Sequence, residues 1–290
     1  MEMNVSNSEE QVVAKKKGGL NPAIIIPVLF LIGLGIYWFI FGNPGNFQKP
    51  EQFGGAASVA FSDVESRKIE PIVGGIPGTI YKGGPIVPIL LTFMMTVLVF
   101  SIERFFVLRK ASGAGNLDVF VTKVRSLLNR NKIDDALAEC DAQQGSVGNV
   151  VKEGLTTYKA LAHDGTLNKE QKMIALTKSI EEATTLEMPM LEKNMMILST
   201  LGTVATLVAL LGTVLGMIKA FAALGGGGGT PDAAALSTGI SEALINTALG
   251  IGTSAVAIIL YNYFTSKIDG LTYKIDEISM SIQQSFAEFH

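Results

Sequence analysis

Cysteine, histidine and charge are all scarce in this chain of 290 residues. The single cysteine, Cys140, excludes an intrachain disulfide framework and a thiolate-rich metal site. The two histidines, His163 and His290, have no metal-ligand spacing around them. A net charge of −3 gives no basic excess with which to neutralise a run of phosphates, so the sequence argues against general nucleic-acid binding. We therefore expect no metal, no cofactor and no nucleic-acid partner.

Catalytic motifs are missing as well. The sequence contains no H-E-x-x-H or G-x-S-x-G pattern. Cys140 has no partner base in view and is more simply interpreted as a small packed residue. The run of glycines from Gly225 to Gly229 lacks the Lys-Ser/Thr pair of a phosphate-binding loop. The sequence therefore predicts a protein that is not an enzyme.

Apolar residues are abundant instead. Hydrophobic residues make up 48% of the chain and charged residues 17%, below the ~25% charge of ordinary soluble domains. A bilayer core needs about 20 apolar residues per helix. Four charge-free windows meet this requirement: between Lys17 and Lys49, Lys82 and Glu103, Lys193 and Lys219, and Glu242 and Lys267. The sequence predicts an all-α integral membrane protein with four transmembrane helices.

The first window could belong to a cleaved signal peptide, because Lys15, Lys16 and Lys17 precede it. Its apolar run is longer than the usual 7–15 residues of a signal peptide, and no A-x-A-like site follows directly. We interpret it as an uncleaved anchor, in which Pro27 could introduce a kink.

Lysine and arginine residues beside the spans indicate the orientation. They precede the first span and follow the second and fourth, whereas the loop between the third and fourth spans has none. We therefore expect both termini in the cytoplasm. The expected segments are a cytoplasmic tail (1–22), an N-terminal anchor (23–42), a periplasmic loop (43–84), the second span (85–108), a cytoplasmic helical domain (109–192), the third span (193–222), a short periplasmic loop (223–236), the fourth span (237–266) and a cytoplasmic C-terminal helix (267–290).

Helical periodicity extends beyond the membrane windows. Apolar residues recur at three- and four-residue spacing through 116–192, with breaks expected at Gly145-Ser146 and at 163–165. The run from Lys169 to Glu192 leads into the third span, so we expect that span to be the end of one long helix. The Thr-Pro-Asp sequence at 230–232 predicts a helix start, and a helix from there to Phe286 would be about 80 Å long.

An apolar stripe follows the fourth span, at Ile268, Leu271, Ile275, Ile278, Ile282 and Phe286. This spacing indicates a helix that packs on another helix. A surface amphipathic helix is the alternative.

Polar side chains occur inside the third and fourth spans. In the third span, one stripe contains Ser199, Thr203, Thr206 and Thr213. In the fourth span, one half of the helix contains Glu242, Asn246, Thr247, Gly250, Thr253 and Ser254, and the other half contains Leu244, Ile251, Ile258 and Ile259. Two polar stripes indicate a hydrated or protein-lined path. Close helix packing is the alternative, because Ser and Thr bond their own helix and Gly212-x-x-x-Gly216 is a small-x-x-x-small motif.

Glu242 lies near the outer rim of the bilayer in this arrangement. It could be an interfacial, solvated carboxylate. In an oligomer, the same residue would form an acidic ring at a pore mouth, which attracts cations.

Two segments, LVALLGTVLGMIKAF (207–221) and ISEALINTALGIGTSAVAIILYNYF (240–264), resemble the MotA/TolQ/ExbB proton channel family, the ExbB branch most closely. Supporting matches are Glu103-Arg104 and the pattern from Ala136 through Cys140 to Leu155. The resemblance covers roughly 85–290. The sequence departs from the family by lacking a proline near Val256 and by adding the span at 23–42.

The resemblance implies a homo-pentameric ring in the bacterial inner membrane, in contact with membrane lipids, with a pore lined by the third and fourth spans. The pore would surround an ExbD-like single-span protein, in two copies, whose membrane aspartate carries the proton. Thr213 and Thr247 match the family's pore-facing threonines, and Glu242 matches the acid near the outer entrance. Together with Thr206 and Asn246, these residues form the expected proton pathway.

Proton flow would then energise a TonB-like protein and, through it, transport across the outer membrane. A TolQ-like or gliding-type envelope motor is the alternative within the same class. A non-conducting membrane scaffold is the alternative from a different class, in which the polar stripes are ordinary packing faces.

Overall fold

The computed structural model describes residues 20–47, 75–225 and 233–289. Four helical stretches are long and apolar enough to cross a membrane: Pro22–Phe41, Gly84–Ala111, Lys169–Leu224 and Ala233–Phe289. These stretches confirm the prediction of an all-helical chain with four candidate membrane spans. Most of the expected N-terminal tail, most of the loop after the first span and the Thr-Pro-Asp helix start at 230–232 lie outside the described residues.

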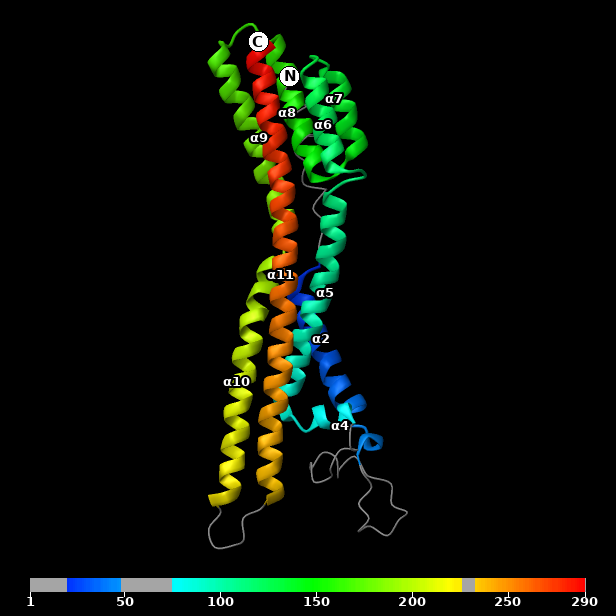
Figure 1. Ribbon diagram of the computed structural model, residues 1–290, viewed down its shortest axis with the longest axis vertical. Helices are drawn as coiled ribbons and strands as arrows, with labels where there is room; N and C mark the ends of the chain where they lie inside the picture. Colours follow the sequence, from blue (N-terminus) through cyan, green and yellow to red (C-terminus); the bar gives the residue numbers. More distant parts are fainter. Residues whose placement is uncertain (1–19, 48–74, 226–232, 290) are drawn as a thin grey trace, which may run out of the picture. The chain divides into compact units, whose positions relative to one another are not determined.

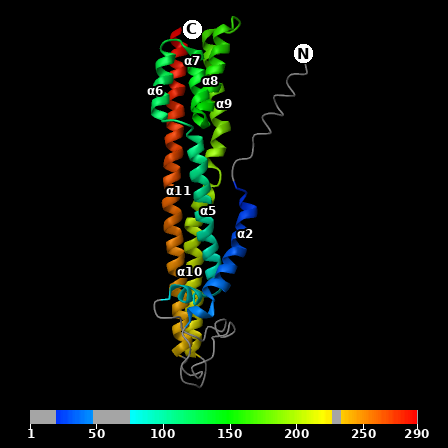
Figure 2. The same ribbon diagram turned by 90° about the vertical axis from the view of Figure 1, so that its right-hand side faces the viewer.

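The chain divides into two compact units, which are described separately (Figures 1 and 2). The first unit, called here the span unit, contains residues 21–101 and 194–262. Its elements are α2 (Pro22–Gly35), the π-helix η1 (Ile36–Phe41), the short helices η2 (Pro44–Asn46), α4 (Ile76–Tyr81) and η4 (Gly84–Ile86), the first part of α5 (Val87–Ala111), α10 (Met195–Gly225) and the first part of α11 (Ala233–Phe289). The described ends of the 43–84 segment are thus partly helical.

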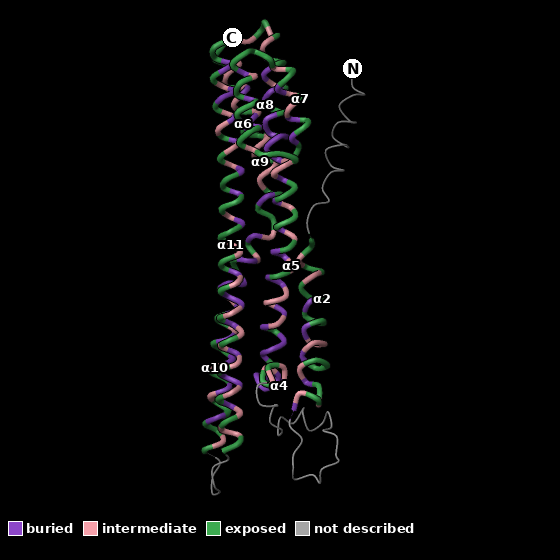
Figure 3. Tube along the Cα trace, turned by 45° about the vertical axis from the view of Figure 1, so that its right-hand side comes forward, coloured by how far each residue is buried: buried purple, intermediate pink, exposed green. Residues whose placement is uncertain are grey.

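The first span, Pro22–Phe41, packs on the rest of the span unit through aromatic residues. The Tyr37 ring stacks on the Tyr81 ring at a centroid distance of 4.7 Å, and the Tyr37 hydroxyl donates to the Tyr81 carbonyl at 3.1 Å. Phe47 and Val87 complete this buried cluster. By contrast, most side chains of α2 are exposed or only partly buried (Figure 3), as suits a helix whose apolar surface faces lipid.

The second unit, called here the bundle unit, contains the described residues of 102–193 and those from Tyr263 onward. Helices α6 (Leu117–Leu128), α7 (Ile133–Gln143), α8 (Gly145–His163) and α9 (Lys169–Glu192) lie side by side with the last part of α11 (Figures 1 and 2). The break expected at 163–165 is confirmed, because α8 ends at His163. The break expected at Gly145-Ser146 lies one residue earlier: α7 ends at Gln143 and α8 begins at Gly145, with Gln144 between them.

The apolar stripe at the end of α11 is buried in this bundle. All six of its residues are at most 5% exposed. Phe286 meets the Tyr158 ring edge-on at 4.9 Å, and a Cβ added at Gly154 would lie 3.4 Å from Ile282. The interpretation as helix-to-helix packing is confirmed, and the surface amphipathic helix is excluded.

The third span does not continue α9 as one helix, so that expectation is wrong. Helix α9 ends at Glu192, Lys193 is extended (ψ 137°), and Asn194 adopts a left-handed conformation (φ 63°) before α10 begins. Asparagine tolerates this conformation better than most residues. The break therefore carries neither the glycine nor the proline that usually marks a helix end in a sequence.

Buried Arg104 stabilises the end of α9. Its guanidinium donates to the carbonyls of Met190 and Leu191, both at 3.3 Å. Glu103 holds the same guanidinium through two hydrogen bonds of 2.6 Å. The last carbonyls of a helix have no partner within that helix, so these bonds satisfy acceptors that would otherwise be orphaned.

Helix α11 is unbroken over its 57 described residues, a length of about 85 Å. This confirms the expectation of a single helix that runs well past the fourth span.

Candidate functional site

Helices α10 and α11 of the span unit approach each other closely through small residues. A Cβ added at Gly250 would lie 2.1 Å from the Cβ of Ala209. A Cβ added at Gly216 would lie 2.8 Å from the carbonyl oxygen of Gly239. A larger residue at either position would force the backbones of the two helices apart. Close helix packing, the alternative that the sequence left open beside a hydrated or protein-lined path, is therefore found at Gly216 of the small-x-x-x-small motif.

This close approach brings Thr213 of α10 and Thr247 of α11 together. Their hydroxyl oxygens are 2.5 Å apart, and both residues are half-buried. Thr213 is also within hydrogen-bond distance of its own helix at the Ala209 carbonyl (3.1 Å), and Thr247 at the Ala243 carbonyl (3.0 Å). Two threonines predicted from separate motifs thus form one hydroxyl pair.

The hydroxyl pair has three possible hydrogen bonds but only two protons, because each threonine carries one donor. In one arrangement Thr213 donates to Thr247, which donates to the Ala243 carbonyl. In the other, Thr247 donates to Thr213, which donates to the Ala209 carbonyl. The pair can therefore reverse its direction of donation without any movement of the helices.

Glu242 lies in an ion pair rather than in solvent. Its two carboxylate oxygens accept from the Lys219 ammonium at 2.8 and 3.0 Å. The Glu242 side chain is 4% exposed, whereas that of Lys219 is 52% exposed. The solvated carboxylate that the sequence left open is thus not found.

Asn246 lies one helical turn after Glu242, against Gly212, and is fully buried. Within the described part of the chain, neither its side-chain oxygen nor its nitrogen has a hydrogen-bond partner. A buried amide of this kind needs a water molecule or another polar group for its hydrogen bonds. Asn246 is therefore the residue of this hairpin that most needs an additional polar partner.

Thr206 is not brought to the other predicted residues. It lies two turns from Thr213 along α10 and is exposed, as are Ser199 and Thr203 of the same stripe. On α11, by contrast, Thr253 and Ser254 are buried, and Ser254 donates to the Gly202 carbonyl. Leu244, Ile251, Ile258 and Ile259 are all exposed, which confirms the predicted division of that helix into two halves.

Sequence reasoning missed Lys219 as the partner of Glu242. The signal was available, because partners in an antiparallel helical hairpin lie at equal distances from the turn. Thr213 and Thr247 lie 17 residues on either side of position 230, and Lys219 and Glu242 lie 11 and 12 residues from it.

The hairpin formed by α10 and α11 lies in the part of the chain that is similar to known proteins. The model of the MotA/TolQ/ExbB proton channel family matches residues 143–277, which include α8, α9, α10 and most of α11. The chain is 26% identical over 222 residues to a biopolymer transport protein ExbB homolog of Methanothermobacter thermautotrophicus, which covers 76% of this chain and 74% of that protein.

Two further relatives match shorter stretches. The chain is 27% identical over 158 residues to the Tol-Pal system protein TolQ of Pseudomonas aeruginosa (53% of this chain, 67% of that protein). It is 33% identical over 110 residues to the biopolymer transport protein ExbB of Xanthomonas campestris pv. campestris (38% and 43%). The family match, these relatives and the four candidate spans agree: over residues 143–277 the chain is similar to the membrane proteins of the MotA/TolQ/ExbB proton channel family, and the relatives named here are ExbB-like or TolQ proteins.

Proposed function

We propose that this chain is the ExbB-like subunit of an inner-membrane motor driven by the proton motive force. Five copies form a ring around two copies of an ExbD-type single-span partner, and proton flow energises a TonB-like protein for transport across the outer membrane. The observation that carries this proposal is the reversible hydroxyl pair of Thr213 and Thr247, next to Asn246, whose buried amide has no hydrogen-bond partner among the described residues.

The hydroxyl pair can interact with a proton-carrying carboxyl group in both of its protonation states. A hydroxyl can donate to a carboxylate and can accept from a carboxylic acid. No Asp, Glu or His lies between Lys193 and Lys219 or between Glu242 and Lys267. The proton-carrying group is therefore assigned to the partner, and this chain supplies the polar surface that the partner's carboxyl group meets.

The proposed orientation keeps both termini and the bundle unit in the cytoplasm. The loops at 43–84 and 223–236 then face the periplasm, and the tail 1–22 and the C-terminal helix 267–290 face the cytoplasm. This arrangement is supported by Arg104, Arg109 and Lys110 after the second span and by Lys267 after the fourth. The proposed spans are 23–42, 85–108, 193–222 and 237–266, with the helical domain at 109–192.

Proton flux through reconstituted protein tests the proposal. The chain and its ExbD-type partner are placed in liposomes with an imposed proton gradient, and a trapped pH dye reports the flux. Thr213→Val and Thr247→Val are expected to lower the flux by about tenfold or more while the ring still assembles, because a hydrogen bond to a charged group contributes about 1.5–3 kcal/mol and about 1.4 kcal/mol is a factor of ten. The matched control is Thr200→Val, because Thr200 is exposed and bonds only to its own turn, at the Met196 carbonyl. Normal flux in both hydroxyl-pair variants would refute the proposed pathway.

The likeness to TolQ supports a second candidate, an envelope motor that works with a TolQ-type set of partners. Co-purification from the native membrane separates the two candidates, because the partner decides the output. Absence of protein-dependent proton flux from every complex would instead favour the scaffold.

A further inference from the structure

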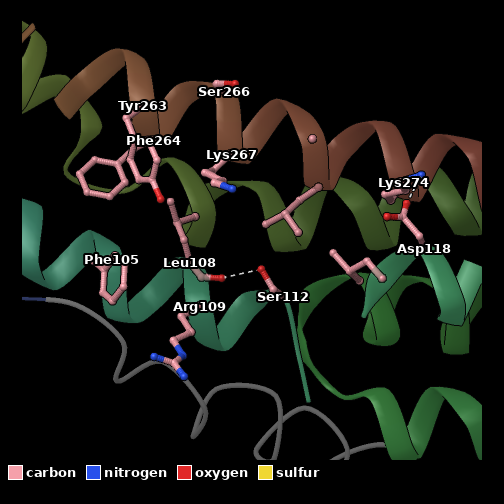
Figure 4. Close-up of a pocket in the computed structure, with 13 residues that line it drawn as sticks. Phe105, Leu108, Arg109, Ser112, Asp118, Tyr263, Phe264, Ser266, Lys267 and Lys274 are labelled. Carbon is pink, nitrogen blue, oxygen red and sulfur yellow. Dashed lines mark hydrogen bonds and ion pairs between the residues drawn. The ribbon is translucent and has the colours of Figure 1, made fainter. Parts of the chain in front are cut away.

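The bundle unit contains a pocket of about 570 Å³ between the end of α5 and the part of α11 that follows Tyr263. Residues of α6 close one end of it. Figure 4 shows Phe105, Leu108 and Arg109 on the α5 side and Tyr263, Lys267 and Lys274 on the α11 side. The lining thus combines aromatic rings with three cations.

Asp118, the acidic residue of the lining, pairs with Lys274 and leaves the charges of Arg109 and Lys267 without a counter-charge in the pocket. Lys274 pairs with Asp118 at 2.8 Å and with Glu277 at 3.1 Å, and these bonds raise the pKa of its ammonium group. Within the described residues, no carboxylate lies within ion-pair distance of Arg109 or Lys267. Lys267 lies over the Tyr263 ring, 5.8 Å from its centroid. The pocket therefore carries an excess of positive charge.

The two uncompensated cations lie just beyond charge-free windows. Arg109 follows Glu103, the first charge after the second window, by six residues, or about 9 Å of helix. Lys267 is the first charge after the fourth window, and Tyr263 precedes it by one turn. The headgroup layer adds about 5–8 Å on each side of the hydrocarbon core, and tyrosine is enriched at that level. Both cations are therefore placed by the sequence near the lipid phosphates.

We propose that this pocket binds an anionic phospholipid, with Arg109 and Lys267 contacting its phosphate and with Phe105 and Tyr263 against the first carbons of an acyl chain. Charge complementarity favours an anionic over a zwitterionic headgroup. Phe105 and Tyr263 are 46% and 47% exposed, so their rings are available to an acyl chain. The lipid site is independent of the proton pathway, which involves none of these residues.

Native mass spectrometry of the full chain, delipidated in detergent and then titrated with lipid, tests the site. Phosphatidylglycerol should be retained about tenfold better than phosphatidylcholine. Each cation near a headgroup contributes about fivefold to binding, so Arg109→Gln/Lys267→Gln should weaken phosphatidylglycerol binding by about twenty-fivefold. The matched control is Arg130→Gln/Lys132→Gln, which removes the same charge from exposed positions outside the pocket. It should leave phosphatidylglycerol binding within about twofold.

The same titration contains the results that would overturn the site. Equal retention of the two lipids would overturn it, and so would equal losses in the two double variants. Arg109→Lys/Lys267→Arg keeps both charges and should keep the lipid, so loss of binding in that variant would show that charge is not the cause. Full displacement of phosphatidylglycerol by millimolar inorganic phosphate would identify a free phosphate, rather than a lipid, as the ligand.

Discussion

At the scale of single residues, the ion pair of Glu242 and Lys219 joins a buried carboxylate to a half-exposed ammonium group. Removing one partner of such a pair leaves the buried group without its bond, at a cost of about 1–3 kcal/mol. We expect Lys219→Met to lower the thermal unfolding temperature measurably in detergent. The double variant Lys219→Met/Glu242→Met should lose less stability than the sum of the losses in the two single variants.

The control for this cycle is Lys178→Met, because Lys178 pairs with Glu182 on an exposed surface. An exposed i,i+4 pair contributes about 0.3–0.5 kcal/mol. Equal effects of the Lys178 and Lys219 variants would show that the burial of Glu242 has no energetic consequence.

Cys140 is the residue whose protonation most clearly depends on folding. Burial raises the pKa of its thiol to about 12, and neighbouring Asp141 adds to the effect. The unfolded chain releases this proton near pH 9, so unfolding is coupled to proton release between pH 9 and pH 12. This contribution to stability is complete below pH 9 and is lost as the pH rises toward 12.

At pH 8 the folded protein should therefore not react with N-ethylmaleimide at Cys140, whereas the unfolded chain should react. A cysteine at an exposed position, Glu170→Cys, provides the positive control in the folded state. Fast labelling of Cys140 itself without denaturant would contradict the buried environment.

At the scale of elements, the hairpin of α10 and α11 offers two glycines in one helical turn with opposite surroundings. A Cβ at Gly250 would lie 2.1 Å from the Ala209 side chain, whereas a Cβ at Gly252 would meet nothing within 4 Å. We expect Gly250→Ala to destabilise the protein by about 1–3 kcal/mol through overpacking. Gly252→Ala should be neutral or stabilising by up to about 1 kcal/mol, because alanine favours the helix.

Thermal unfolding of the two alanine variants measures this difference. A greater loss of stability with Gly252→Ala than with Gly250→Ala would mean that the two helices do not meet along this face.

The helices and the two faces of α11 could be predicted because both follow from periodicity. The stripe from Ile268 to Phe286 depends only on spacing, and the structure buries all of it. The bond of Ser254 to the Gly202 carbonyl and the pairing of Lys219 could not be obtained in this way, since they depend on the register between two helices. The break at Asn194 was missed because it carries no glycine or proline, and because the side chain that bonds the last carbonyls of α9, Arg104, lies about 90 residues away in the sequence.

At the scale of the whole molecule, the pore of the proposed motor needs several copies of the chain. Native mass spectrometry of the complex, extracted gently from its own membranes, should show five copies of this chain with two copies of a small single-span protein. That protein should contain an aspartate within its membrane span. A monomer or dimer bound to soluble proteins would instead favour the scaffold and would make Thr213 and Thr247 packing residues.

Two of the connections between the units, the one within α11 at 262/263 and the one at 193/194, differ in how they transmit rotation. Because α11 has no break, one residue inserted near Asn262 would turn everything beyond it by about 100° and move the stripe from Ile268 to Phe286 out of register. At Lys193 and Asn194 the backbone leaves the helix, so the phase of α9 is not inherited by α10. Natural insertions and deletions should therefore be tolerated at the second connection and excluded from the first. The helical phase is therefore passed on through α11 and is lost at Lys193 and Asn194.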